Sequence, residues 1–392
     1  MRIMRGVTLA TQTQLGSFVA AGFLAMMVSS VDAASYTISD LGTLGSPSSD
    51  ANGINNSGLV VGIACPSNCP FVFRGFAYQH GAISTLPTLG GPDDSTTSAN
   101  AVSDAGHIVG SSQAGPPNYG FHAFVYAGGT MTDLGTLGGA ISSAYGVNKL
   151  GTVVGISELP GNLTRRAFVA TASGGMTELG TLSGRDNSAA IGINVAGEIV
   201  GIAFNGGGEE LRAFVYRNGS IDDLGTLGGR YSKAYAINDS GDIVGGSTYP
   251  GDSADHAFLY RNGSFHDLGS LPGTSFSVAL AVNGSGHAVG FANSPNLGDL
   301  AFLYANGTLI NLSALIEVQE AGWQALTEAR GINDQGQIVG TGINRLGLRH
   351  AFLLTPVPEP LTALFMLVGL GGVAGLVGWR GTISRPRSPQ ST

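Results

Sequence analysis

The sequence predicts an all-β protein, a closed seven-bladed β-propeller of four-stranded blades, followed by a C-terminal transmembrane helix. Seven copies of one repeat support this prediction, and their period of 44 to 50 residues is in the range of propeller blades. Each copy follows the pattern Ile-Asn-x-x-Gly-x-Ile-Val-Gly with constant internal spacing. Its polar position is occupied by Asn55, Ser103, Asn148, Asn194, Asn238, Asn283 and Asn333, and its last glycine by Gly62, Gly110, Gly155, Gly201, Gly245, Gly290 and Gly340.

Two turn signals divide each copy into short strands. The first is Asn-x-x-Gly, in which the asparagine side chain can bond to its own backbone and the glycine can adopt a positive φ. The second is Asn-Gly, as at Asn218-Gly219, which is the strongest short hairpin signal. In the fifth copy, these turns separate strands that we expect at 233–238, 242–247, 256–260 and 264–268. Four short strands in a meander form one propeller blade.

The strand before Asn-x-x-Gly is expected to be the innermost strand of each blade. It is built on small residues, as in Ala234-Tyr235-Ala236, and such residues suit the crowded axis of a propeller. This order places the tight turns on one face of the ring. The Gly-Thr-Leu-Gly-Gly connections and the loops of variable sequence then lie on the opposite face.

The two ends of the repeat region are expected to complete the seventh blade together. The region opens with a lone outer strand at 36–42 and ends with the third strand of a blade at 350–354. Pairing these strands would close the ring and remove the exposed sheet edges, which otherwise invite aggregation. An open β-solenoid with the same repeat is the alternative.

The composition is typical of a rigid β protein and excludes one class of partner. Charged residues make up 11% of the chain, and the glycines and prolines stand periodically in turns, so they do not indicate disorder. The net charge is −8, and it becomes −11 without the two terminal segments, which hold five arginines and two acidic residues. Nucleic-acid binding needs the opposite sign, so we expect no nucleic-acid partner.

Residues 1–33 are predicted to be a signal peptide. Arg2 and Arg5 precede an apolar run at 15–28, and Val31-Asp32-Ala33 supplies small residues where signal peptidase needs them. A signal anchor is the alternative, but the run is short for a membrane span. The mature chain is therefore expected to be exported, with residues 34–356 forming the propeller.

Residues 357–392 form a second targeting segment. Pro358-Glu359-Pro360 precedes an apolar stretch at 361–379, which as a helix spans about 28 Å, close to the thickness of the bilayer core. Arg380 and two more arginines follow, on the side that stays cytoplasmic. This order resembles the PEP-CTERM sorting signal. The resemblance implies an exosortase-type partner and inner-membrane anchorage before release to the cell surface or beyond. A plain membrane anchor is the alternative.

The repeat itself resembles the HAF family of extracellular repeats, named for His-Ala-Phe. That triplet stands at His122, His256 and His350, and an Ala-Phe pair recurs in six copies, while the first copy reads as a swapped pair, Phe76-Ala77. The resemblance covers about residues 36–354 and implies export and a β-repeat fold, with no activity attached. Because the histidines fall in different blades, we expect them to form hydrogen bonds at strand edges rather than to share a metal.

Few motifs could carry chemistry. Cys65 and Cys69 share one loop, where a disulfide is expected outside the cytoplasm; the alternative, a metal site, lacks two ligands. The sequence contains no phosphate loop, nucleophile elbow or zincin helix. We therefore predict no catalytic, cofactor-binding or metal-binding residue.

Two classes of function remain. The first is a non-catalytic surface or extracellular-matrix protein that binds polysaccharide or protein through its variable loops, with Tyr119, Arg165, Glu210 and Arg345 as candidate contacts. The second is a propeller enzyme that acts on extracellular glycans. Such an enzyme needs converging carboxylates, and Glu209-Glu210 and residues 252–255 are the clusters worth testing. We favour the first class.

Deleting residues 358–360 is expected to block processing while the ring stays folded, because the sorting signal loses its recognition motif. Neutral replacements of Arg380 and the two following arginines should weaken retention of the span at the inner membrane. Immunoblots of cell fractions and protease accessibility of intact cells measure both effects. A deletion variant of unchanged size and surface exposure would contradict the sorting signal.

Overall fold

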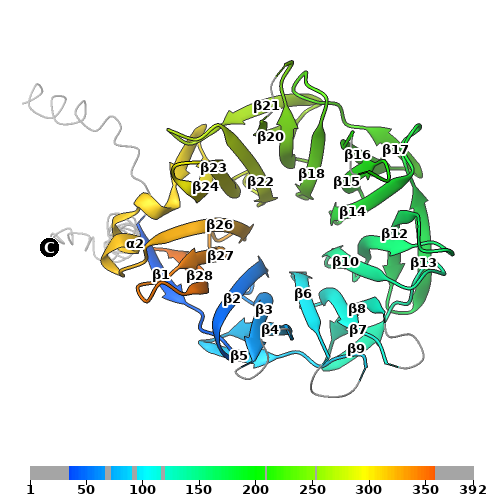
Figure 1. Ribbon diagram of the computed structural model, residues 1–392, viewed down its shortest axis with the longest axis horizontal. Coiled ribbons are helices and arrows are strands. Elements are labelled where there is room, and N and C mark those ends of the chain that lie inside the picture. The colour runs from blue at the N-terminus through cyan, green and yellow to red at the C-terminus, as the bar shows by residue number, and fades with distance from the viewer. Residues whose placement is uncertain are drawn as a thin grey trace, which may run out of the picture. The chain divides into compact units, whose positions relative to one another are not determined.

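The computed structural model describes residues 35–66, 72–90, 95–115, 120–207, 210–251 and 254–357. Their strands form seven four-stranded antiparallel sheets arranged around an axis (Figure 1). The predicted closed seven-bladed propeller is therefore confirmed, and the open solenoid is wrong. The predicted signal peptide, the sorting motif and the apolar stretch at 361–379 lie outside the described residues. Within the ranges given above, no helix has the length and apolar character needed to cross a membrane.

The first four blades follow one another along the chain. Blade 1 contains β2 (Gly45–Ile54), β3 (Val60–Pro66), β4 (Arg74–Gln79) and β5 (Ala82–Thr85). Blade 2 contains β6 (Thr97–Val102), β7 (Ile108–Gln113), β8 (Phe121–Ala127) and β9 (Thr130–Asp133). Blade 3 contains β10 (Ser142–Val147), β11 (Val153–Glu158), β12 (Arg165–Thr171) and β13 (Gly174–Gly180). Blade 4 contains β14 (Asn187–Ile193), β15 (Ile199–Phe204), β16 (Arg212–Arg217) and β17 (Ser220–Asp223).

The remaining three blades complete the ring. Blade 5 contains β18 (Ser232–Ile237), β19 (Ile243–Thr248), β20 (Asp255–Arg261) and β21 (Ser264–Gly269). Blade 6 contains β22 (Phe276–Val282), β23 (Ala288–Ser294), β24 (Gly298–Ala305) and β25 (Thr308–Asn311). Blade 7 contains β26 (Ala325–Ile332), β27 (Ile338–Ile343), β28 (Arg349–Pro356) and, from the other end of the chain, β1 (Tyr36–Asp40). The first strand of each copy lies nearest the axis, as predicted (Figure 1).

Both turn predictions are confirmed by the backbone. Asn218 and Gly219 have φ angles of 52° and 82°, and Asn262 and Gly263 have nearly the same pair, as a two-residue hairpin of this type requires. In the Asn-x-x-Gly turns the glycine has a positive φ, for example 83° at Gly241. The Asn-x-x-Gly and Asn-Gly turns lie at the same end of each blade, which we call the turn face. The opposite end, which carries the variable loops, is the loop face.

Two neighbouring residues leave space only for glycine at the last position of the repeat motif. Gly245 on β19 stands opposite Ala234 on the inner strand and Phe258 on the third strand. A Cβ atom there would lie 1.9 Å from the carbonyl oxygen of Lys233 and 2.9 Å from the Phe258 ring. The ring of Phe258 is fully buried over this glycine. The Ala-Phe pair and the distant glycine are therefore parts of one packing unit.

The first copy corrects one sequence interpretation. Phe76 pairs with Gly62, as the phenylalanine does in the other blades, and Gly75 occupies the place of the alanine. The pair is therefore not swapped to Phe76-Ala77. The first copy keeps its phenylalanine in register and has glycine where the other copies have alanine.

Neighbouring blades are joined by apolar layers and by buried serines. In one layer, Val200 and Val215 of blade 4 pack with Ile243 and Phe258 of blade 5. Between blades 2 and 3, the Ser142 hydroxyl donates to the carbonyl of Gly135 (2.6 Å) and accepts from the Ala123 N–H (2.8 Å). The same pair of bonds is made by Ser49, Ser188, Ser232 and Ser277.

A ring of asparagines joins the blades on the turn face. In blade 5, the Asn238 Oδ1 atom accepts from the N–H groups of Ser240 (3.0 Å) and Asp242 (2.9 Å), which completes its own turn. Its Nδ2 atom donates to the carbonyl of Asn283 in blade 6 (2.9 Å). The equivalent bonds between blades, at 2.9 to 3.3 Å, run from Asn55 to Ser103, Asn148 to Asn194, Asn194 to Asn238, Asn283 to Asn333 and Asn333 to Asn55.

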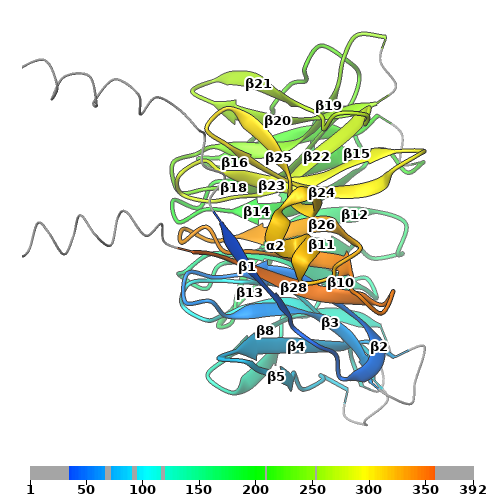
Figure 2. The same ribbon diagram turned by 90° about the vertical axis from the view of Figure 1, so that its left-hand side faces the viewer.

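Pairing of the two ends closes the ring. β1 pairs with β28 from Tyr36 opposite Pro356 to Asp40 opposite Phe352 (Figure 2). The Leu41 N–H extends the ladder by donating to the carbonyl of Ala351 (3.0 Å). The predicted strand pairing between 36–42 and 350–354 is confirmed.

A short insertion between blades 6 and 7 was not expected from the repeat. It contains the 3₁₀ helix η1 (Leu312–Ala314) and the helix α2 (Ile316–Glu320), and it accounts for the longest spacing between successive copies, 50 residues. Val318 on α2 is buried in the same cluster as Trp323 and Phe352. Glu317 accepts a hydrogen bond from the Tyr36 N–H (3.3 Å), so the insertion covers the start of the closing strand.

Deleting residues 36–41 is expected to destabilise the ring by on the order of several kcal/mol. The deletion removes the buried side chains of Tyr36 and Leu41 and the ladder bonds to β28. Thermal unfolding followed by circular dichroism measures the loss. A variant that keeps the full melting temperature would show that closure does not stabilise the ring.

Asn238→Ala is expected to cost about 2 to 4 kcal/mol, because two turn N–H groups lose their partner and the bond to the Asn283 carbonyl of the next blade is lost, although that carbonyl still accepts from the Gly286 N–H. Denaturant unfolding measures the change. Gln335→Ala, in the exposed part of another turn, is the matched control and should cost less than about 0.5 kcal/mol. Equal stability of the two variants would contradict a joining role for the asparagines.

Candidate functional site

The axis of the ring contains two cavities separated by an aliphatic collar. The collar is formed by the β-branched residue before the asparagine of each copy, or before Ser103 in the second copy; these residues are Ile54, Val102, Val147, Ile193, Ile237, Val282 and Ile332. On the turn face the cavity is small, about 250 Å³, and is lined by the asparagine ring and the residues that follow it. On the other side of the collar, towards the loop face, lies a larger cavity of about 610 Å³.

A β-bulge in every inner strand builds the larger cavity. In blade 5, the register skips from Ala234 to Ala236, so Tyr235 is left without a partner residue on β19. A bulge bends the strand and re-aims the side chain of the extra residue. The same shift occurs in all seven blades, and all seven extra residues line the larger cavity. They are Asn52, Asn100, Tyr145, Ile191, Tyr235, Leu280 and Arg330, and we call them the bulge ring.

The bulge ring is polar on one side and apolar on the other. Blades 7, 1 and 2 contribute Arg330, Asn52 and Asn100, and blade 7 adds Glu328. Blades 4 and 6 contribute aliphatic side chains, and Phe291 on β23 extends this apolar side. The two tyrosines come from blades 3 and 5. The cavity can therefore offer hydrogen bonds to one edge of a ligand and apolar contact to the rest.

Hydrogen bonds hold the polar side in place. Arg330 donates to the Glu328 carboxylate (2.8 Å) and to the Asn52 side-chain oxygen (3.3 Å). The Asn52 Nδ2 atom donates to the Ala99 carbonyl of the next blade (2.8 Å), and Asn100 bonds the Ala144 carbonyl in the same way (2.8 Å). These bonds fix the polar groups before any ligand arrives, which reduces the entropy cost of binding.

Two features describe the polar groups that a ligand would meet. The Arg330 side chain lines the cavity and is 37% exposed, while its Nε atom is buried without a hydrogen-bond partner among the described residues. Burial raises the pKa of Tyr235, and Asp255 and Glu328 act in the same direction, while Lys233 opposes them. The Tyr235 hydroxyl is therefore neutral at physiological pH and can both donate and accept.

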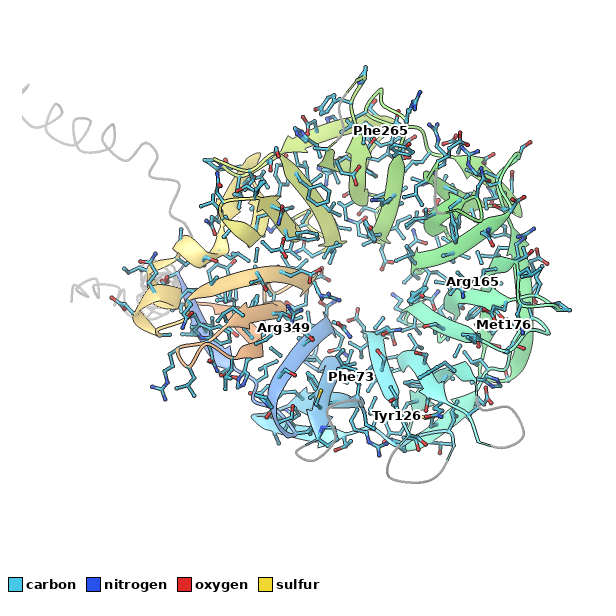
Figure 3. The ribbon with its side chains drawn as sticks, in the orientation of Figure 1. Phe73, Tyr126, Arg165, Met176, Phe265 and Arg349 are labelled. Atoms are coloured by element: carbon cyan, nitrogen blue, oxygen red, sulfur yellow. The ribbon has the colours of Figure 1, made fainter. Side chains whose placement is uncertain are left out.

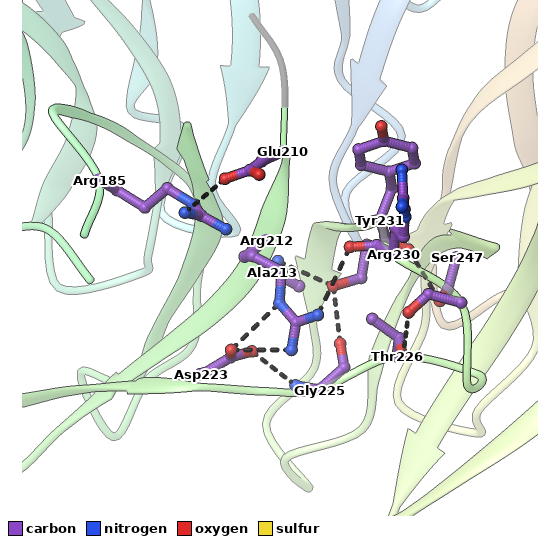
Figure 4. Close-up of polar contacts among 12 residues, drawn as sticks. Arg185, Glu210, Arg212, Ala213, Asp223, Gly225, Thr226, Arg230, Tyr231 and Ser247 are labelled. Atoms are coloured by element: carbon purple, nitrogen blue, oxygen red, sulfur yellow. Dashed lines mark hydrogen bonds and ion pairs between the residues drawn. The ribbon is translucent and has the colours of Figure 1, made fainter. Parts of the chain in front are cut away.

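The residues predicted from the sequence as ligand contacts lie on the loop face, in separate blades. Arg165 begins β12 and forms an ion pair with Glu158 (3.1 Å). Glu210 precedes β16 and forms an ion pair with Arg185 (2.9 Å; Figure 4). Arg345 is exposed in the β27–β28 loop, and Tyr119 lies outside the described residues. The predicted contacts surround the axis rather than converge; Figure 3 shows Arg165 and, beside the β27–β28 loop, Arg349 on opposite sides of the ring.

The cysteine and the histidines singled out in the sequence contact residues of the fold itself. Cys65 is a buried, free cysteine in the described part of the chain, with its Sγ atom 3.8 Å from the Ser48 hydroxyl; Cys69 lies outside that part, so the disulfide stays a prediction. His122 and His350 each contact an aspartate of the outer strand, Asp133 and Asp40, at 2.9 and 2.8 Å. This is the strand-edge hydrogen bonding expected for them. Among the residues described, no group of three or more His, Cys, Asp or Glu side chains could hold a metal.

The bulge ring was not among the sites predicted from the sequence. Its signal was present in the repeat, because the position between two small residues of the inner strand holds a different type of side chain in most copies. In the sequence alone, Tyr145 and Tyr235 look like exceptions in a small-residue strand. Only the bulge, which requires the pairing of two strands, directs them to the axis.

No protein-family model matches the chain, and no curated protein sequence matches it. Solved structures that it resembles include TolB from Acinetobacter baumannii, with 12% identity and a TM-score of 0.42 over 80% of this chain and 64% of that one. A gluconolactonase from Xanthomonas campestris has 12% identity and a TM-score of 0.38, over 83% and 96% of the two chains. A sialidase from Trypanosoma rangeli has 10% identity and a TM-score of 0.39, over 91% and 60%. Likeness at this level carries no argument about function.

Proposed function

We propose that this chain is an exported, non-catalytic surface or extracellular-matrix protein that binds polysaccharide through its loop face. The observation that carries the proposal is the division of the ring into a uniform turn face and a varied loop face. On the turn face, repeated hydrogen bonds use the side chains to join blades. On the loop face, each blade presents a different loop on the same rigid scaffold, which is the usual place for binding residues.

The two ends of the ring lie on the turn face. β28 begins at the β27–β28 loop on the loop face, and β1 runs antiparallel to it with Tyr36 opposite Pro356. The variable loops are therefore on the face opposite both ends of the ring.

Several exposed apolar side chains lie on the loop face. Leu163 in the β11–β12 loop is 92% exposed, and Leu346 in the β27–β28 loop is 71% exposed. Phe73, Phe121 and Leu297 are also exposed beside the loops of three other blades. Apolar and aromatic side chains interspersed with arginines and acids suit a polymer with hydroxyl groups and apolar ring faces. The net charge of −11 opposes an acidic polymer unless cations bridge it.

The alternative of a glycan-processing enzyme has weaker support. Catalysis on a glycosidic bond needs two carboxyl groups that converge on the substrate. Glu210 and Asp255, from the two clusters predicted to be worth testing, form ion pairs with Arg185 (2.9 Å) and Lys233 (2.9 Å). Their neighbours Glu209 and Asp252 lie outside the described residues. Glu328, which lines the axial cavity, is also bound to an arginine.

Combined alanine replacement of Tyr119, Arg165, Glu210 and Arg345 is expected to weaken binding to the host's extracellular polysaccharide about tenfold, equivalent to about 1.4 kcal/mol. Co-sedimentation of the purified full chain with that polysaccharide measures the change. The matched control replaces exposed residues of the turn face, Leu150, Ser240 and Gln335, and should bind like the parent chain. Equal binding by the two sets would refute the loop-face proposal, and release of reducing ends from the polysaccharide would favour the enzyme.

A further inference from the structure

We infer that the larger axial cavity is a second binding site, which takes one neutral sugar unit of a soluble glycan or of a chain end. The inference deepens the proposed function, on which it rests for the class of ligand. It assigns to the bulge ring a role that is separate from that of the variable loops. The cavity volume of about 610 Å³ is in the range of small-molecule sites.

The repeat itself indicates that the bulge ring is not needed for packing. The alanine before the bulge is fully buried in each of the seven blades, as at Ala51, Ala144 and Ala234. The bulge residue between the packed positions ranges from asparagine to tyrosine, isoleucine, leucine and arginine. If this position served only to fill the axis, one residue type would suffice in every blade. The variation is concentrated where the side chains meet in the cavity.

The two charges that line the cavity favour a neutral ligand. Among the described residues that line the cavity, Glu328 and Arg330 are the charged ones, and they neutralise each other at 2.8 Å. An anion would meet the Glu328 carboxylate, and a cation would meet the Arg330 guanidinium. A neutral ligand with several hydroxyl groups avoids both conflicts, because a hydroxyl can accept from Arg330 and donate to Glu328.

The apolar side of the cavity restricts the neutral ligand further, to one that also has an apolar face. A sugar ring has hydroxyl groups around its edge and C–H groups on its faces. The exposed part of the Arg330 guanidinium and the fixed Asn52 side chain can bond to the edge. Tyr145 and Tyr235 offer aromatic surfaces, and Ile191 and Leu280 offer aliphatic ones, for contact with a face. A purely apolar ligand would remove the polar groups from water without offering them a hydrogen bond, at a cost of about 1 to 3 kcal/mol each.

The test is calorimetric titration of the full chain in detergent with methyl glycosides of glucose, galactose and mannose. At least one is expected to bind with a Kd on the order of 1 mM. Arg330→Met should weaken that binding about tenfold, because the hydrogen bonds to the edge are lost while the aliphatic stem remains. Leu280→Trp should abolish it by filling the cavity. Arg230→Met, the same replacement at an exposed arginine that belongs to neither proposed site, is the matched control and should bind like the parent chain.

Several outcomes would overturn the inference. They are the absence of binding by all three glycosides, binding that Arg330→Met and Leu280→Trp leave intact, and preferential binding of sulfate or glycine, which would indicate an anion or zwitterion site. Melting temperatures of the variants within a few degrees of the parent value exclude misfolding as the cause of a loss. Failure of the loop-face proposal is distinguishable, because it concerns polysaccharide co-sedimentation and a different set of variants.

Discussion

The closed ring depends on one side chain, the asparagine that begins each Asn-x-x-Gly turn. Its two polar atoms act in different directions: Oδ1 satisfies N–H groups of its own turn, and Nδ2 bonds a carbonyl of the next blade. One side chain therefore completes its own turn and also joins that turn to the neighbouring blade, whose carbonyl accepts a second bond beside the one from its own turn glycine. The bond from Asn333 to Asn55 continues this series across the junction of the two ends of the ring. Ser103 is the exception, and its hydroxyl accepts only from its own turn, from the His107 N–H.

A second constraint acts at the last glycine of the repeat. It explains why the internal spacing is the same in every copy while one residue of each inner strand is free to vary. The last glycine lies between the inner-strand bulge and the phenylalanine of the third strand, and neither neighbour leaves space for a Cβ atom. The three positions must therefore change together or not at all. The bulge that crowds the glycine also frees one residue to face the axis. Structural uniformity and a varied axial cavity come from the same local geometry.

The meander of each blade separates the two faces physically. Its tight turns and its longer loops fall at opposite ends of the strands, and the exchange of β1 into blade 7 places Tyr36 and Pro356 together on the turn face. The loops and the larger cavity are therefore on the same side of the collar. One molecule of the protein could then bind a polymer through its loops and a sugar unit at its axis at the same time.

The sequence by itself determined the number of blades, the strands within them, the innermost strand and the closure of the ring, because these follow from local turn chemistry and from a repeated pattern. It also placed Arg165, Glu210 and Arg345 on a common face. It did not reveal the α2 insertion, the true register of Phe76, the serine and asparagine bonds between blades, or the bulge ring. Each of these depends on which residue stands opposite which across two strands or two blades. That information arises only when the strands of a blade pair with one another and the blades pack around the axis, so the tertiary structure alone decided that seven residues of varied type surround one cavity.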